Sequence, residues 1–155
     1  MSQVENKLKE LGITLPEVAK PIAAYVPGVL DGDHVYVSGQ LPSVDGVLAY
    51  DGHAGAERTV EEAYAAARLS AINGLAVIKS LVGDLDRVER VVKVTGFVNS
   101  APGFSDQPAA INGASELLVA VFGERGAHAR SAIGLIGLPR NALVEVEMIV
   151  RIKKS

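Results

Sequence analysis

The sequence contains neither cysteine nor tryptophan, and aromatic residues make up only 5% of it. Without cysteine the chain forms no disulfide and has no thiol for nucleophilic chemistry. Few aromatic side chains remain to stack on nucleic acid bases. The sequence also lacks an uninterrupted apolar run of the roughly 18 residues that a membrane-spanning helix needs, and the charged stretch 2–11 does not fit a secretory signal. We therefore expect a soluble, cytoplasmic protein with no membrane partner.

An excess of positive charge is absent as well. The 15 Lys and Arg residues stand against 18 Asp and Glu residues, and the basic residues are scattered apart from Lys153-Lys154. Nucleic acid is therefore not expected as a partner, because its binding depends on clustered basic residues that neutralise phosphates. The histidines, His34, His53 and His128, lie in separate segments without the spacing of metal ligands, and no glycine pattern matches a phosphate-binding loop. We expect neither a metal nor a cofactor.

The composition that remains is apolar. Of the 155 residues, 48% are hydrophobic, and the mean hydropathy is +0.25. A chain of this length buries one sizeable core, so we expect a single domain over 1–155 in which 1–20 form an N-terminal extension. Large apolar patches are rarely left in water, and the apolar surplus therefore predicts an oligomer.

Hydrophobic periodicity and turn residues predict an α+β order of elements. Ser2 with Glu5, and Thr59 with Glu62, have the form of helix-starting capping boxes. In order, the patterns predict a short helix that ends at Gly12, a hairpin of strands 22–30 and 34–38, a loop with one edge strand at 47–48, a helix over 59–83, a strand over 88–98, a helix over 108–122, and strands over 129–136 and 143–152. This order indicates a single mixed sheet with two main helices on one face, plus an extra short N-terminal helix. The uncovered face would be buried against another subunit.

Arg130 is the first candidate for a functional residue, because it stands at the head of the apolar run 132–136. Its guanidinium stays protonated and presents a planar fork that grips carboxylates, which suits a small anionic ligand. The alternative is an internal salt bridge with a carboxylate of the same chain. Without further context this structural role is slightly favoured, since such pairs are common in folded proteins.

Glu145 and Glu147 are the second candidates. Strand alternation points both carboxylates to one face, where like charges are unfavourable unless a cation, water or ligand separates them. If the two final strands pair, they bring Glu145 or Glu147 close to Arg130, or to the same residue of an adjacent subunit. The alternative is a solvated outer face, which fits Glu147 better than Glu145.

Ser38 and Gly39 form the third candidate, at the end of a predicted strand in Ser38-Gly39-Gln40-Leu41-Pro42. A hydroxyl, a flexible backbone and an amide can supply donors at the rim of a pocket. Taken alone, this segment is a strand that ends in a turn. Ser131 stands near His128 in the sequence but lacks the context of a catalytic serine.

The order and spacing of these segments resemble the reactive intermediate deaminase A (RidA/YjgF) family over nearly the whole chain after Pro21. The segments that carry the resemblance are Tyr25-Val26-Pro27-Gly28-Val29, Val37-Ser38-Gly39-Gln40-Leu41-Pro42, and the stretch from Ala129-Arg130-Ser131 through Leu138-Pro139 to Val144-Glu145-Val146-Glu147. Ala23-Ala24, Pro102, His128 and Ala132 differ from the usual residues of the family and indicate a divergent branch.

The resemblance implies a chorismate-mutase-like fold and a homotrimer with clefts at its subunit interfaces. It also implies cofactor-independent hydrolysis of enamines or imines to keto acids and ammonia, on substrates that arise from pyridoxal-phosphate enzymes. Carried over by position, Arg130 would hold the carboxylate of the substrate, Glu145 would orient water or move a proton, and Tyr25, Ser38 and Gly39 would line the cleft. The alternatives are a non-catalytic trimer that binds small carboxylates as a sensor or scavenger and, less favoured, an endoribonuclease.

Overall fold

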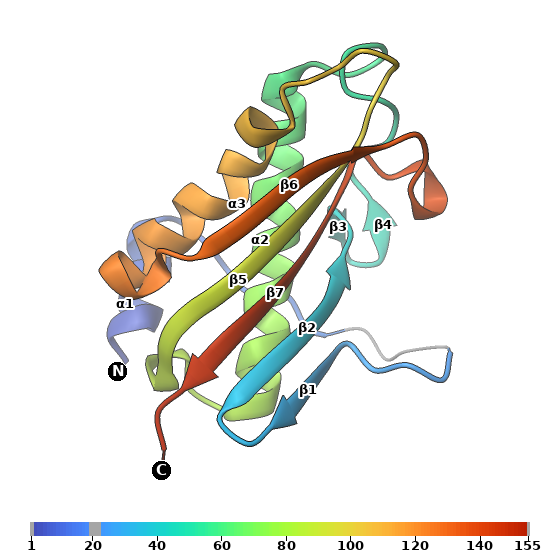
Figure 1. Cartoon of the computed structure of the whole chain (residues 1–155). Helices are drawn as coiled ribbons and strands as arrows, with labels where there is room; N and C mark the ends of the chain where they lie inside the picture. The colour runs from blue at the N-terminus through green and yellow to red at the C-terminus, as the bar shows by residue number, and fades with distance from the viewer. Residues whose placement is uncertain (1, 19–22, 155) are drawn as a thin grey trace.

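The computed structural model describes residues 2–18 and 23–154 of the chain. Its helices are α1 (Gln3–Glu10), α2 (Val60–Val82) and α3 (Gln107–Phe122), and its strands are β1 (Gly28–Asp31), β2 (His34–Gln40), β3 (Ser43–Val44), β4 (Val47–Leu48), β5 (Val88–Asn99), β6 (Ala129–Leu135) and β7 (Val144–Ile152). Short 3₁₀ turns follow α2 and α3 and precede β7, at Leu85–Arg87, Gly123–Gly126 and Pro139–Asn141. The predicted α+β class and the main elements are confirmed (Figure 1).

Five strands form one mixed sheet in the order β1-β2-β7-β5-β6. All neighbours are antiparallel except β5 and β6, which are parallel. Parallel neighbours need a long crossover, and α3 provides it between β5 and β6. The condition that the two final strands pair is therefore not met, because β5 lies between β6 and β7.

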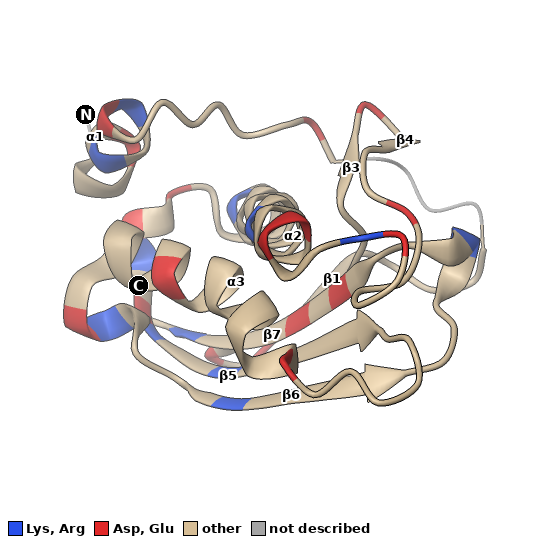
Figure 2. Cartoon of the chain, turned by 90° about the horizontal axis from the view of Figure 1, so that it is seen from above, with Lys and Arg blue, Asp and Glu red and all other residues tan. Residues whose placement is uncertain are grey.

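The helices α2 and α3 cover one face of the sheet, as Figure 2 shows from above. The strand residues under them are apolar and alternate with outward-facing ones, which in β7 gives the buried set Val144, Val146, Met148, Val150 and Ile152. By length and composition alone α2 resembles a membrane-spanning helix, but 61% of its most apolar 18-residue window is buried inside the protein. It is the central helix of the core, packed against the sheet on one side and α3 on the other.

The close packing of α2 and α3 depends on small residues at their contact. A Cβ atom added at Gly113 would lie 2.0 Å from the carbonyl oxygen of Tyr64 in α2. The facing side of α2 carries alanines, among which Ala63, Ala66 and Ala67 are fully buried. The two helix backbones therefore approach closely only because position 113 has no side chain.

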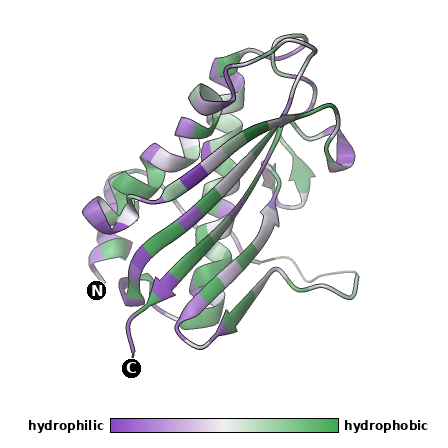
Figure 3. Ribbon diagram, in the orientation of Figure 1, coloured by the Kyte–Doolittle hydropathy of each residue, from purple (hydrophilic) through white to green (hydrophobic). Residues whose placement is uncertain are grey.

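The other face of the sheet exposes large apolar side chains. The registers of β1, β2, β5, β6 and β7 place Val29, Tyr36, Ile149, Phe97 and Ile133 on this face. Tyr36 and Ile133 are 46% and 44% exposed. Figure 3 shows that apolar residues are frequent along the strands of this sheet. An apolar sheet face of this kind is commonly covered by another subunit.

The N-terminal extension is docked on the domain. The hydroxyl of Ser2 accepts a hydrogen bond from the backbone of Glu5, which confirms the predicted helix start. The carboxylate of Asp86 accepts two more, from the backbone N–H groups of Gln3 and Val4. Val4 and Leu8 are buried. The first helix is therefore held both by its N-terminal hydrogen bonds and by an apolar face.

Two local expectations need correction. The strand predicted over 22–30 begins only at Gly28, because residues 23–25 form a bend, and position 22 lies outside the described residues. The single edge strand predicted at 47–48 is half of a separate two-stranded sheet, in which β4 pairs with β3. Gly46, with a φ of 78°, makes the turn that lets these short strands pair with each other.

Candidate functional site

Arg130 lies on the edge strand β6, and its pairing with Val94 turns its side chain towards α3. Its Nη1 donates to Asn112 Oδ1 at 2.8 Å and to Ser115 Oγ at 3.2 Å. No Asp or Glu in the described part of the chain forms an ion pair with it. The internal salt bridge that the sequence slightly favoured is therefore wrong, and two neutral oxygen atoms hold the guanidinium instead.

His128 stands beside this arginine. Its Nε2 is 2.9 Å from Ser115 Oγ, and its Nδ1 is 2.6 Å from the carbonyl oxygen of Gly126. Burial lowers the pKa of His128, and the positive charge of Arg130 lowers it further, against the opposing effect of the hydrogen bond to Gly126. Burial and the nearby positive charge therefore favour the neutral imidazole. Its hydroxyl partner is Ser115 of α3, not the nearby Ser131.

The contacts of Arg130 with α3 were missed by the sequence reasoning. Asn112 and Ser115 are three positions apart on a predicted helix, so their side chains share one face. That spacing was the available signal. It marks two polar residues on one face of a mostly apolar helix, but it does not say which strand lies below them.

Glu145 lies on β7 and points to the uncovered face of the sheet, half-buried. A Cβ atom added at Gly39 would lie 2.5 Å from its Oε2, so the carboxylate lies over a glycine that leaves room for it. Burial raises the pKa of Glu145, and the negative charge of Glu147 raises it further. As predicted, Glu145 and Glu147 share one face and Glu147 is the exposed member. A carboxyl group with a raised pKa suits proton transfer near neutral pH.

Tyr25, Ser38 and Gly39 lie where the end of β2 meets the segment before β1. Ser38 Oγ donates to the carbonyl oxygen of Val26 at 2.7 Å, which ties the end of β2 to the segment before β1. Tyr25 is 65% exposed. Tyr25 and Gly39 line a cavity of about 480 Å³ whose wall also includes Pro16–Val18, Arg140 and residues of α2. Of the predicted cleft residues, Gly39 therefore lies against Glu145, Ser38 precedes it in β2, and Tyr25 lines a cavity together with Gly39.

Arg130 and Glu145 are not brought together within the subunit. They lie on opposite faces of the sheet, with β5 between their strands. Glu145 pairs across β5 with Ile133 rather than with Arg130, so the two residues are about 10 Å apart across the sheet and about 10 Å apart along it. We call Arg130, Asn112, Ser115 and His128 the arginine half-site, and Ser38, Gly39 and Glu145 the glutamate half-site.

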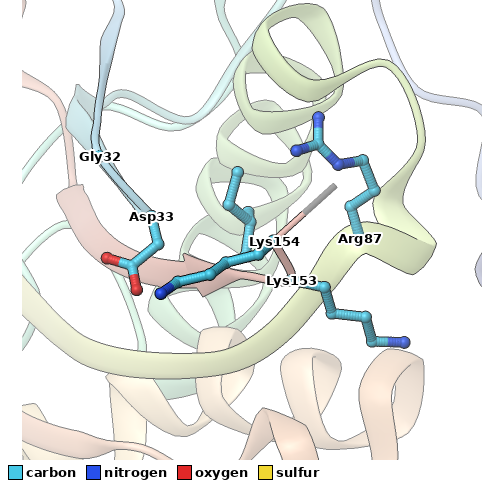
Figure 4. A pocket seen from close by; sticks show the side chains of 6 residues that line it. Gly32, Asp33, Arg87, Lys153 and Lys154 are labelled. Atoms are coloured by element: carbon cyan, nitrogen blue, oxygen red, sulfur yellow. The ribbon is translucent and has the colours of Figure 1, made fainter.

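A third region lies where the turn between β1 and β2 meets the C-terminal end of β7, and it carries several basic residues. Arg87, Lys153 and Lys154 line an open hollow of about 450 Å³ together with Gly32, Asp33 and Ile152. Figure 4 shows that their charged ends point in different directions, with Lys154 on the side of Asp33 and Arg87 and Lys153 turned away. The three cations do not converge on one point, so this hollow does not form an anion site. Within 2–18 and 23–154, no group of three or more His, Asp or Glu side chains is placed to hold a metal ion.

Comparison with known proteins gives matches over nearly the whole chain. A family model described as "YjgF/chorismate_mutase-like, putative endoribonuclease" matches residues 5–152. The chain is 46% identical over 151 residues to Protein TCP17 of Trypanosoma cruzi, a match that covers 97% of this chain and 94% of that protein. It is 32% identical over 142 residues to a 2-iminobutanoate/2-iminopropanoate deaminase of Dermatophagoides farinae, with 91% and 95% covered.

Solved structures with the same fold support these matches. A protein of unknown function from Agrobacterium tumefaciens superposes with a TM-score of 0.90 at 49% identity, over 97% of this chain and 93% of that one. A "putative endoribonuclease" from Shewanella oneidensis superposes with a TM-score of 0.93 at 36% identity, over 97% and 100%. E. coli TdcF with bound serine superposes with a TM-score of 0.62 at 25% identity, over 89% and 94%.

Proposed function

The chain belongs to the YjgF/RidA family, and from this premise we propose that it hydrolyses reactive 2-imino or 2-enamino acids to 2-keto acids and ammonia. The observation that carries the proposal is the state of Arg130, a cation held by neutral groups with no carboxylate of its own subunit beside it. A substrate carboxylate would supply the missing negative charge. The similarity to a 2-iminobutanoate/2-iminopropanoate deaminase and to a fold relative with bound serine supports a small amino-acid-like ligand.

The proposed reaction needs few catalytic groups, because the carbon of an imine is already electrophilic. Water adds to that carbon, the nitrogen takes up a proton, and cleavage of the C–N bond releases ammonia and leaves the keto acid. Arg130 fixes the carboxylate, and Glu145 takes a proton from the attacking water and returns it to the leaving nitrogen. The raised pKa of Glu145 suits both directions of transfer, and binding both groups at one site supplies the orientation.

The separation of the two half-sites supports a cyclic assembly. Because Arg130 and Glu145 lie on opposite faces of the sheet, one subunit can join its arginine half-site to the glutamate half-site of a neighbour. A contact between two different surfaces of identical chains gives a ring when the rotation between neighbouring chains closes. We infer a homotrimer in which the apolar sheet face is buried and each of three clefts takes residues from two subunits.

An ammonia-release assay on freshly generated imines of several amino acids tests the activity. Arg130→Lys keeps the charge but loses the planar fork, so affinity for a keto acid should fall by about 1.5–3 kcal/mol by calorimetry. Glu145→Gln keeps the shape but removes the base, so turnover should fall by about 10²-fold or more while binding stays near that of the parent. Gel filtration and circular dichroism of each variant serve as controls for assembly and folding. Unchanged turnover in Glu145→Gln would refute the catalytic role.

A non-catalytic carboxylate-binding trimer is the second candidate. Ala132 of β6 places an apolar methyl two positions after Arg130, where the family resemblance leads one to expect a cysteine. A protein that only binds carboxylates needs Arg130 and tolerates the amide at position 145. The parent protein would then bind keto acids without releasing ammonia from any imine offered.

Endoribonuclease activity is named for relatives of the chain and is the third candidate. A net charge of −3 offers little counterion release on binding to RNA. Filter binding to mixed RNA at physiological salt tests it. A submicromolar affinity that weakens steeply with added salt would favour this candidate over the deaminase.

A further inference from the structure

The hydrogen bonds that reach Arg130 form a chain whose direction is fixed at both ends. At one end, the carbonyl oxygen of Gly126 can only accept, so Nδ1 of His128 carries the proton. At the other end, the guanidinium of Arg130 can only donate, so Ser115 Oγ accepts from it. Between them, a neutral imidazole leaves Nε2 of His128 without a proton, so Nε2 accepts from the Ser115 hydroxyl. This arrangement requires a neutral imidazole, in agreement with the lowered pKa of His128.

These hydrogen bonds contact the guanidinium at only one of its nitrogen atoms. Both hydrogen bonds of Arg130, to Asn112 and to Ser115, come from Nη1. Among the residues that the structure describes, none accepts from Nε or Nη2. These two nitrogens form one edge of the planar group, which is the edge that can bind both oxygens of a carboxylate at once.

We propose that Ser115 and His128 are positioning residues that hold Arg130 through Nη1 and so present its Nε–Nη2 edge to the carboxylate of the substrate. This proposal deepens the proposed function and rests on it. An arginine side chain has many rotamers, and fixing it before binding lowers the entropy cost of gripping the ligand. Neutral partners are required for this role, because a carboxylate in their place would compete with the ligand for the charge.

The three residues link the strand β6 to the helix α3. Ser115 comes from α3, His128 from the residues just before β6, and Arg130 from β6 itself. The chain of hydrogen bonds therefore joins the arginine to the helix that covers its strand. Movement of Arg130 away from this place breaks two hydrogen bonds at Nη1 rather than one.

The test uses a matched pair at position 115. Ser115→Ala removes the hydroxyl, whereas Ser115→Thr keeps it. Loss of one such hydrogen bond should raise the Kd for a keto acid and the KM for imines about three- to tenfold in Ser115→Ala and leave kcat within about twofold, and Ser115→Thr should match the parent. His128→Phe keeps a flat ring but removes the acceptor, and it should behave like Ser115→Ala.

A double-mutant cycle with Arg130→Lys separates positioning from a general structural effect. If Ser115 acts through the guanidinium, Ser115→Ala should add almost no further loss of affinity in the Arg130→Lys background. An equal loss in both backgrounds, or no loss in the parent background, would overturn the positioning role and leave the proposed function standing. If Arg130→Lys itself binds as tightly as the parent, the site assignment fails and the positioning role fails with it.

Discussion

Mixing two inactive variants should restore activity if each cleft takes Arg130 from one subunit and Glu145 from its neighbour. Arg130→Ala disables the arginine half-site, and Glu145→Gln disables the glutamate half-site, so each variant alone should be nearly inactive. A hybrid oligomer contains clefts in which the intact Arg130 of one variant meets the intact Glu145 of the other. This expectation follows from the placement of the two residues on opposite faces of the sheet with β5 between them.

The size of the effect follows from random assembly. In an equal mixture, a cleft is intact when its arginine half-site comes from a Glu145→Gln subunit and its glutamate half-site from an Arg130→Ala subunit. Each condition holds with a probability of one half, so about a quarter of the clefts in any closed ring should be intact. The mixture should therefore recover about a quarter of the parent ammonia-release rate.

The assay requires subunit exchange, so the two variants are unfolded together in urea and refolded, and light scattering confirms the trimer. The control is the same mixture combined after refolding, which should stay near the activity of the single variants if exchange is slow. A second control is the double variant Arg130→Ala/Glu145→Gln mixed with parent subunits. Activity of the refolded mixture no higher than that of the separate variants would mean that Arg130 and Glu145 do not share an interfacial cleft, and a monomer in light scattering would refute the assembly itself.

Three further predictions concern single residues. Gly39→Ala should push the Glu145 carboxylate from its place, because the new Cβ would lie 2.5 Å from Oε2. We expect turnover to fall by about 10²-fold, while keto acid binding, measured by calorimetry, is retained. Turnover equal to that of the parent would contradict this. Glu147→Gln removes a negative charge that raises the pKa of Glu145, so that pKa should fall. Since the base must be ionised to act, the acidic limb of the pH–rate profile should move to lower pH. A shift to higher pH or no shift would show that Glu145 does not control this limb. Gly113→Ala places a Cβ 2.0 Å from the Tyr64 carbonyl oxygen and should lower the free energy of unfolding by about 1–3 kcal/mol in urea titrations. The control Gly137→Ala, whose new Cβ meets no atom within 4 Å, should change this free energy little. Equal effects of the two substitutions would contradict the close helix contact.

Local patterns were sufficient to predict most elements of the fold. Thr59 and Glu62 form the capping box that starts α2, with both of its hydrogen bonds present, and the long β-branched run after residue 87 forms the buried strand β5. Such features depend on neighbours in the sequence, so the sequence contains them directly. The order of strands depends instead on contacts between distant segments. Nothing in the residues of β6 and β7 indicates that β5 lies between them.

The candidate site was likewise predictable from the sequence only in part. The sequence named Arg130 and Glu145 by their motif, and strand alternation placed Glu145 and Glu147 on one face. It could not show that Arg130 faces α3 while Glu145 faces away from it, because the face of a residue on one strand is independent of the face on another. The partners of Arg130, Asn112 and Ser115, come from a helix whose position over β6 is a long-range property.

The electrostatics of the subunit explain why separated half-sites suit this chemistry. A half-buried guanidinium and a carboxylate of raised pKa would neutralise each other if they were paired within one chain, and the pKa of Glu145 would then fall. The fold prevents this by placing β5 between them and by giving Arg130 two neutral acceptors. Glu145 keeps a raised pKa because its environment is partly buried and its charged neighbour is Glu147. The positive charge of Arg130 therefore stays available to a ligand, and the proton affinity of Glu145 stays suited to transfer. In the proposed trimer, the two groups would meet only across the width of a bound substrate, and both properties would be kept.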